Sequence, residues 1–157
     1  MEKSLKRTAE LLLLLLVAAC GGSKKPEAYN NELMVIINDN DKYISEMNKA
    51  MIAADYEKAS EVREVWEADL KKQIEQVEKI GDFNGDDILQ RGILSGLKAY
   101  EKIVKEDYVK LIDIRSSGTK DPTAETEALN NINDAFEKAA GSVNKAGSEF
   151  ERKYAQD

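Results

Sequence analysis

Asp82, Asn84 and Asp86 alternate along one short segment, a spacing that could place three oxygen ligands around a cation. Calcium loops of the EF-hand type begin with ligands at this spacing. Those loops also require glycine at their sixth position and glutamate at their twelfth, where this chain has Asp87 and Ile93. The segment is thus a partial match to a metal site. The favoured interpretation is a turn between two helices, capped by Asp86 or Asp87, with no bound metal.

The chain contains no histidine and only one cysteine, and these two counts exclude many kinds of catalytic and cofactor site. Without histidine there is no Ser-His-Asp or Cys-His pair, no imidazole base and no His-ligated haem or di-iron site. A single cysteine excludes an internal disulfide, a thiolate zinc site and a redox pair. We therefore expect no catalytic residues and no cofactor, and a protein that is not an enzyme.

The surroundings of Cys20 are typical of an exported precursor. Basic residues precede an unbroken apolar run, Leu11–Ala19, which is shorter than the roughly 20 residues of a membrane-spanning helix. The run has the length of a signal-peptide apolar region, and it ends Val17-Ala18-Ala19-Cys20. This ending resembles the lipobox of bacterial lipoproteins, which implies a signal peptide over 1–19, cleavage before Cys20 and acylation of its thiol. The alternative is an ordinary signal peptide followed by an incidental cysteine.

Acylation of Cys20 would make the membrane a partner of the protein through its N-terminal lipid. Each CH₂ group buried in the bilayer contributes about 0.8 kcal/mol to membrane binding, and two or more acyl chains anchor a protein stably. The predicted tether that follows, residues 21–27, reaches at most about 25 Å, so we expect the folded part, 28–157, near the bilayer surface. Gly21 stands where an aspartate would mark inner-membrane retention. That favours the outer membrane, on its periplasmic face or its outer surface.

The charge of the chain narrows the class of partner. The formal net charge of the whole chain is −7. Residues 1–19 carry a net charge of +1, from Lys3, Lys6 and Arg7 against Glu2 and Glu10, so the remaining residues carry −8. An acidic domain repels phosphate backbones, so nucleic acid is not an expected partner. It also gains no electrostatic attraction to anionic lipids, so attachment to a membrane depends on the acyl chains.

Apolar residues recur every three or four positions through four segments, each of which predicts an amphipathic helix. The predicted helices span 28–54, 56–80, 87–115 and a last segment that Asp121 and Pro122 open and that runs to Tyr154. Short connections force neighbouring helices to run antiparallel, so we predict an all-α, up-down-up-down four-helix bundle. The alternative is an elongated three-helix arrangement in which the first two helices fuse across Asp55.

Several single residues predict details of this bundle. Asp55 is the expected N-cap of the second helix, and Gly81 is its expected stop. Phe83 is expected to plug one end of the core. Gly92 and Gly96 lie one helical turn apart, and each weakens a helix relative to alanine. We therefore expect a neighbouring helix to approach closely at these two glycines.

Two further sets of residues could line a ligand site. The tyrosines could form a slot, although aromatic residues at helical spacing more often belong to the core. They are Tyr29, Tyr43, Tyr56, Tyr100, Tyr108 and Tyr154. Polar residues on or near the apolar stripes could coordinate a ligand, but a role in fixing helix register, or simple placement at the boundary of the core, is favoured. These are Asn40, Gln73, Asp107 and Asn133.

Three segments carry a resemblance to a known family. They are Glu27-Ala28-Tyr29-Asn30, Val77-Glu78-Lys79-Ile80-Gly81-Asp82-Phe83-Asn84-Gly85-Asp86 and Phe150-Glu151-Arg152-Lys153-Tyr154. The arrangement resembles a family of small, uncharacterised surface lipoproteins of leptospires and other bacteria. The resemblance implies a location in the cell envelope and a helical fold. It carries over no catalytic residues.

The sequence therefore favours a lipid-anchored envelope protein without enzymatic activity, acting as an interaction or structural module with an envelope or host protein as its partner. The alternative is a periplasmic or surface binder of a small ligand or cation, in the bundle core or at the turn 82–87. The specific partner or ligand does not follow from the residues.

Overall fold

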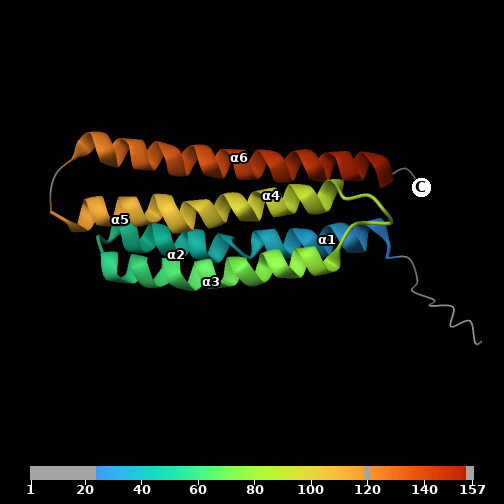
Figure 1. The fold of residues 1–157 in the computed structure, drawn as a ribbon, viewed down its shortest axis with the longest axis horizontal. Helices are drawn as coiled ribbons and strands as arrows, with labels where there is room; N and C mark the ends of the chain where they lie inside the picture. Colours follow the sequence, from blue (N-terminus) through green and yellow to red (C-terminus); the bar gives the residue numbers. More distant parts are fainter. Residues whose placement is uncertain (1–23, 119–120, 155–157) are drawn as a thin grey trace, which may run out of the picture.

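The computed structural model describes residues 24–118 and 121–154 (Figure 1). The predictions for the signal peptide and for Cys20 lie outside the described residues. The helices are α1 (Pro26–Asn38), α2 (Asp41–Ile52), α3 (Tyr56–Ile80), α4 (Ile88–Lys102), the π-helical turn η1 (Ile103–Asp107), α5 (Tyr108–Ser116) and α6 (Pro122–Tyr154). The all-α prediction is confirmed.

These elements form four helical rods that lie side by side (Figure 1). The rods are α1 with α2, then α3, then α4 with η1 and α5, and finally α6. The start of α1, the turn 81–87 and the end of α6 lie at one end, here called the basal end. The turn 53–55, the end of α5 and the start of α6 lie at the other, distal end. Among the described residues, no helix combines the length and the apolar character that a bilayer span requires.

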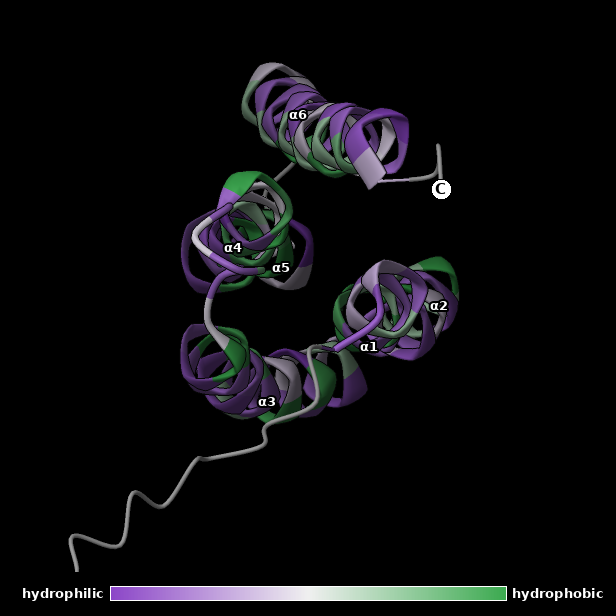
Figure 2. Cartoon of the chain, turned by 90° about the vertical axis from the view of Figure 1, so that its right-hand side faces the viewer, coloured by the Kyte–Doolittle hydropathy of each residue, from purple (hydrophilic) through white to green (hydrophobic). Residues whose placement is uncertain are grey.

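The rods do not contact one another equally. Viewed along the bundle, α6 lies against α4 and α5, on the side of them opposite to α3 (Figure 2). At the α4–α6 contact, a Cβ added at Gly92 would fall well inside contact distance of the Ala146 Cβ. At Gly96 it would lie 2.8 Å from Val143 Cγ2 and 3.3 Å from Ile37 Cδ1. The predicted close approach at both glycines is therefore confirmed.

The predicted helix ends follow the expected capping chemistry. Asp55 Oδ1 accepts a hydrogen bond from Lys58 N at 3.0 Å, and Asp121 Oδ1 accepts one from Ala124 N at 3.0 Å. Gly81 ends α3 with a φ of 76°, in the left-handed region that glycine enters without steric cost. Ala54, the last residue of the predicted first helix, lies beyond α2 and is exposed. Its φ of 53° turns the chain, so the alternative of one helix fused across Asp55 is wrong.

The predicted first helix, 28–54, is in fact two helices, because Asn40 interrupts it. The Asn40 side chain is fully buried, and its Nδ2 donates to the carbonyl oxygens of Ile37 at 2.9 Å and Ile36 at 3.4 Å. These bonds satisfy carbonyl groups at the end of α1. The predicted third helix, 87–115, is also interrupted, by the π turn η1. This turn accommodates one extra residue, so that Asp107 and Tyr108 are both buried.

Candidate functional site

The segment 81–87 forms a tight basal turn. Phe83 and Asp86 exchange two backbone hydrogen bonds, at 2.8 and 2.9 Å, around Asn84 and Gly85. Asn84 and Gly85 have φ values of 54° and 87°, and a two-residue turn of type I′ requires positive φ at both central positions. Asp82 Oδ1 accepts a hydrogen bond from Gly85 N at 2.7 Å. The Asp82 carboxylate therefore stabilises the turn itself.

Asp86 ties the turn to two helices. Its Oδ1 accepts a hydrogen bond from Ile88 N at 2.9 Å, at the start of α4. Its Oδ2 accepts from Lys153 Nζ at 2.5 Å and from Tyr154 Oη at 3.1 Å, both on α6. The bond from Lys153 is the main reason that the pKa of Asp86 lies below its ordinary value. A cation bound by Asp82, Asn84 and Asp86 would have to compete with these donors. Among the described residues, no group of three or more Asp, Glu, His or Cys side chains could hold a metal ion.

Phe83 fills the basal end of the core, as predicted. Its ring centroid lies 5.2 Å from that of Tyr29, 5.3 Å from Phe150 and 4.9 Å from Tyr154. The Tyr29 hydroxyl donates to the Gly81 carbonyl oxygen at 2.7 Å, which joins α1 to the basal turn. Burial, with the nearby Asp82 charge, raises the pKa of Tyr29 to about 12. The basal turn is therefore held to α1 and α6 by aromatic packing and polar bonds together.

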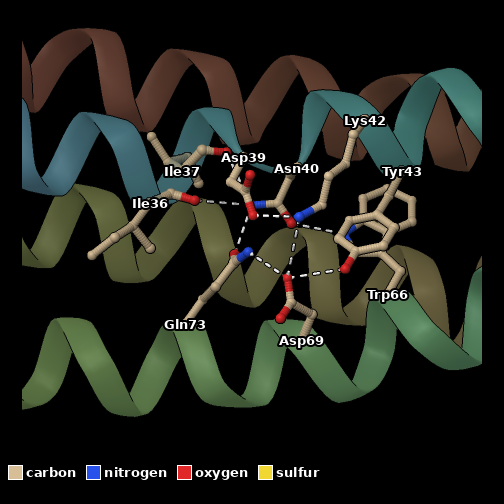
Figure 3. Close-up of polar contacts among 9 residues, drawn as sticks. All are labelled: Ile36, Ile37, Asp39, Asn40, Lys42, Tyr43, Trp66, Asp69 and Gln73. Carbon is tan, nitrogen blue, oxygen red and sulfur yellow. Dashed lines mark hydrogen bonds and ion pairs between the residues drawn. The ribbon is translucent and has the colours of Figure 1, made fainter.

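A buried polar network lies midway along the bundle, at the break between α1 and α2 (Figure 3). Asn40 Nδ2 donates to Gln73 Oε1 at 2.7 Å, and Trp66 Nε1 donates to Asn40 Oδ1 at 2.7 Å. Gln73 Nε2 donates to Asp69 Oδ2 at 3.1 Å, which also accepts from the Tyr43 hydroxyl at 3.1 Å. The polar groups of Asn40 are all used within the protein. This network joins α1, α2 and α3, and of the two favoured interpretations of Asn40 and Gln73 it agrees with a role in helix register, since both side chains are buried.

The other two residues predicted for a polar layer lie elsewhere. Asp107 is buried in η1, and Asn133 is exposed on α6. The tyrosines do not form one slot either. Tyr29 and Tyr154 lie at the basal end, and Tyr43, Tyr100 and Tyr108 surround Trp66 with ring centroids 5.9 to 6.2 Å from it.

An apolar groove, here called the distal groove, lies between α2, α5 and α6. Its volume is about 310 Å³, and its apolar lining includes Ile44, Met51, Leu111, Leu129, Ile132 and Phe136. Ile52 borders it and is 86% exposed, the most exposed of the large apolar side chains described. Arg115 closes one side through an ion pair with Glu125 at 2.7 Å. The sequence did not reveal this groove, because its residues lie at the edges of separate stripes and only the packing of α6 brings them together.

No protein-family model, no curated protein and no solved structure matches the chain. The resemblance to surface lipoproteins therefore stays a prediction, of which a helical domain of four packed rods is confirmed.

Proposed function

We propose that the protein is a non-enzymatic, lipid-anchored module of the bacterial cell envelope, and that it presents its distal end to a protein partner. The observation that carries this proposal is the lipobox-like ending at Cys20, only a few residues before α1 begins at Pro26. The proposal includes an up-down-up-down bundle behind a cleaved signal peptide, and a location at the outer membrane.

The lengths of the elements support such an arrangement. The tether between Cys20 and Pro26 reaches at most about 20 Å, so acyl chains on Cys20 would keep the basal end close to the bilayer. α6 has 33 residues and is therefore about 50 Å long. An anchored bundle standing on its basal end would hold the distal groove and Ile52 tens of ångströms above the lipid head groups.

The anchor is tested by replacing Cys20 with serine in cells that produce the full chain. We expect the wild-type protein to incorporate labelled palmitate and to begin at residue 20 after processing, whereas Cys20→Ser loses the label and remains unprocessed. Ser23→Ala is the matched control, because it makes a similarly small change within the tether, and it should retain both. Unchanged processing and membrane partitioning of Cys20→Ser would refute the anchor.

The distal end is proposed as the partner surface because it exposes apolar side chains beside a groove. Ile52 combines high exposure with contact to the distal groove, whereas Val65, 59% exposed, lies on α3 away from it. Exposed apolar side chains that continue into a groove are typical of interaction sites. Cross-linking in whole cells should give one reproducible partner for the wild type and for Val65→Asp, and should lose it for Ile52→Asp. Equal recovery with both variants would exclude the distal groove.

A binder of a small ligand is the alternative function, and Tyr108 favours it. The Tyr108 side chain lines the distal groove, is almost fully buried, and has no hydrogen-bond partner among the described residues. Burial raises its pKa to about 12. A mostly apolar groove that offers a free hydroxyl donor suits an apolar ligand that carries an acceptor. Thermal melts with calcium, haem and hydrophobic ligands test this alternative, and no shift in melting temperature would remove it.

A further inference from the structure

The basal turn contains the dipeptide Asn84-Gly85, which is the only Asn-Gly pair in the chain. An asparagine that precedes glycine is chemically labile, because glycine has no side chain to hinder the approach of its backbone nitrogen to the asparagine amide. Asn84 and Gly85 are both exposed, and a Cβ added at Gly85 would have nothing within 4 Å. Water and dissolved base therefore reach this dipeptide freely.

The reaction open to this dipeptide is an intramolecular substitution at the Asn84 side chain. The Gly85 nitrogen loses its proton to a base in solution and attacks Cγ of Asn84, and the new C–N bond closes a five-membered succinimide ring. The side-chain nitrogen takes up a proton and leaves as ammonia. Water then opens the ring at one of its two carbonyl groups, which leaves either aspartate or isoaspartate at position 84.

The fold opposes this reaction at the attacking nitrogen. Gly85 N donates its hydrogen to Asp82 Oδ1 at 2.7 Å. A hydrogen bond to a charged acceptor is stronger than one to a neutral acceptor, and a negative charge beside the nitrogen disfavours the loss of its proton. The Asp82 carboxylate therefore keeps the Gly85 nitrogen protonated and unreactive.

The backbone of the turn opposes ring closure as well. Asn84 has a φ of 54°, and Phe83 and Asp86 exchange two backbone hydrogen bonds across it. The succinimide ring brings Cβ of Asn84 and the Gly85 nitrogen nearly into one plane, which requires a ψ far from the value of about +47° that a left-handed residue adopts. The turn therefore has to open before the ring can form.

We propose that Asn84 is a modification site that is deamidated through a succinimide, and that the hydrogen bond from Gly85 to Asp82 sets the rate by holding the turn closed. The reaction needs water and no enzyme. This inference is independent of the proposed lipid anchor and of the distal groove.

The modification loosens the basal end of the bundle. Isoaspartate adds one carbon atom to the backbone within the two-residue loop, so Phe83 and Asp86 no longer lie opposite each other with both hydrogen bonds formed. Phe83 is buried in the core, and Asp86 binds Lys153 of α6. Both of these contacts depend on the shape of the turn and weaken together.

The test is incubation of the purified full-length protein in neutral to mildly alkaline buffer, followed by peptide mass spectrometry. We expect Asp82→Ala to convert Asn84 roughly tenfold or more faster than the wild type, because the loss of a hydrogen bond to a charged acceptor shifts an opening equilibrium by about that factor. Asp121→Ala is the matched control, because Asp121 also accepts a backbone N–H three residues on, from Ala124 at the distal end. It should leave the rate at Asn84 unchanged. Equal rates for wild type and Asp82→Ala would overturn the role of Asp82.

Two further comparisons keep the test decisive if Asp82→Ala does not fold. The wild-type chain unfolded in urea should convert Asn84 faster than the folded protein does, and faster than it converts its other asparagines. An unreactive Asn84 in the unfolded chain would overturn the site itself. Asp82→Asn keeps an acceptor oxygen at the same place, so it should convert Asn84 more slowly than Asp82→Ala, and equal rates for these two variants would overturn the role of the hydrogen bond.

Thermal melting tests the predicted loosening. The deamidated protein, separated by its added negative charge, contains isoaspartate and should melt at a lower temperature than Asn84→Asp. That variant carries the same charge without the extra backbone atom, so it is the matched control. Equal melting temperatures would overturn the loosening of the basal end.

Discussion

Replacing Gly92 with alanine is the sharpest test of the packing described above. Gly92 lies on α4, and an added Cβ would overlap the Ala146 Cβ of α6 while lying 3.2 Å from the Ser142 carbonyl oxygen. The Ala146 Cβ is attached directly to the backbone and cannot rotate away. The two helices would have to separate along the contact on which α6 chiefly depends.

The magnitude follows from two opposing effects. Overpacking costs about 1–3 kcal/mol, and this site belongs at the upper end because backbone must move. Replacing glycine with alanine within a helix returns about 1 kcal/mol. We therefore expect Gly92→Ala to lower the free energy of unfolding by about 2 kcal/mol, measured by urea denaturation followed by circular dichroism. For a domain of this size the melting temperature should fall by roughly 6–10 °C.

Two controls separate packing from helix propensity. Gly141 is an exposed glycine in the middle of α6, and an added Cβ would have nothing within 4 Å, so Gly141→Ala should raise stability by about 1 kcal/mol. Combining Gly92→Ala with Ala146→Gly moves the methyl group from one helix to the other and should recover most of the loss. The expected coupling energy is about 2–3 kcal/mol. A neutral or stabilising effect of Gly92→Ala alone would refute the close contact between α4 and α6.

Three further outcomes are expected. Asn40→Ala should cost about 3 kcal/mol in urea denaturation, because it leaves the buried indole N–H of Trp66 without an acceptor. Phe83→Ala should cost about 3 kcal/mol by the same measurement, because it removes the ring that fills the basal end. The pKa of Asp86 is lower in the folded protein than the value of about 3.9 in the unfolded chain. The bond between Asp86 and Lys153 therefore stabilises the fold fully at pH values above the unfolded-state pKa. This stabilisation is lost as the pH falls through the folded-state pKa. The difference in unfolding free energy between wild type and Asp86→Asn should therefore be largest above about pH 5 and vanish at the lowest pH. Urea unfolding repeated across this pH range measures the difference, and a constant difference would contradict this role.

Sequence periodicity predicted the rods well, because each rod buries one apolar face. The caps at Asp55 and Asp121 and the stop at Gly81 could be placed because their chemistry is local. The close approach at Gly92 was also predictable, since two glycines within a helix otherwise only weaken it. These features depend on residues near one another in the chain.

The interruptions and the distal groove could not be predicted in the same way. Asn40 was recognised as a polar residue on an apolar stripe, but its bonds to Trp66 and Gln73 depend on how α3 packs. The π turn contains neither proline nor glycine, so no residue type in the sequence marks it. In the structure, its sign is that Asp107 is buried directly before Tyr108, which breaks the regular spacing of buried positions. The distal groove arises where α6 meets other rods, so the residues that line it are distant in the sequence.

An even number of rods brings Pro26 and Tyr154 to the same end of the molecule (Figure 1). A fluorescent reporter fused beyond α6 would therefore lie at the end of the bundle where α1 begins, leaving the opposite tip unobstructed. A peptide inserted after Gly118 would instead occupy that tip. Imaging the two fusions side by side would report where the protein resides and whether its tip must stay uncovered, without changing a single core residue.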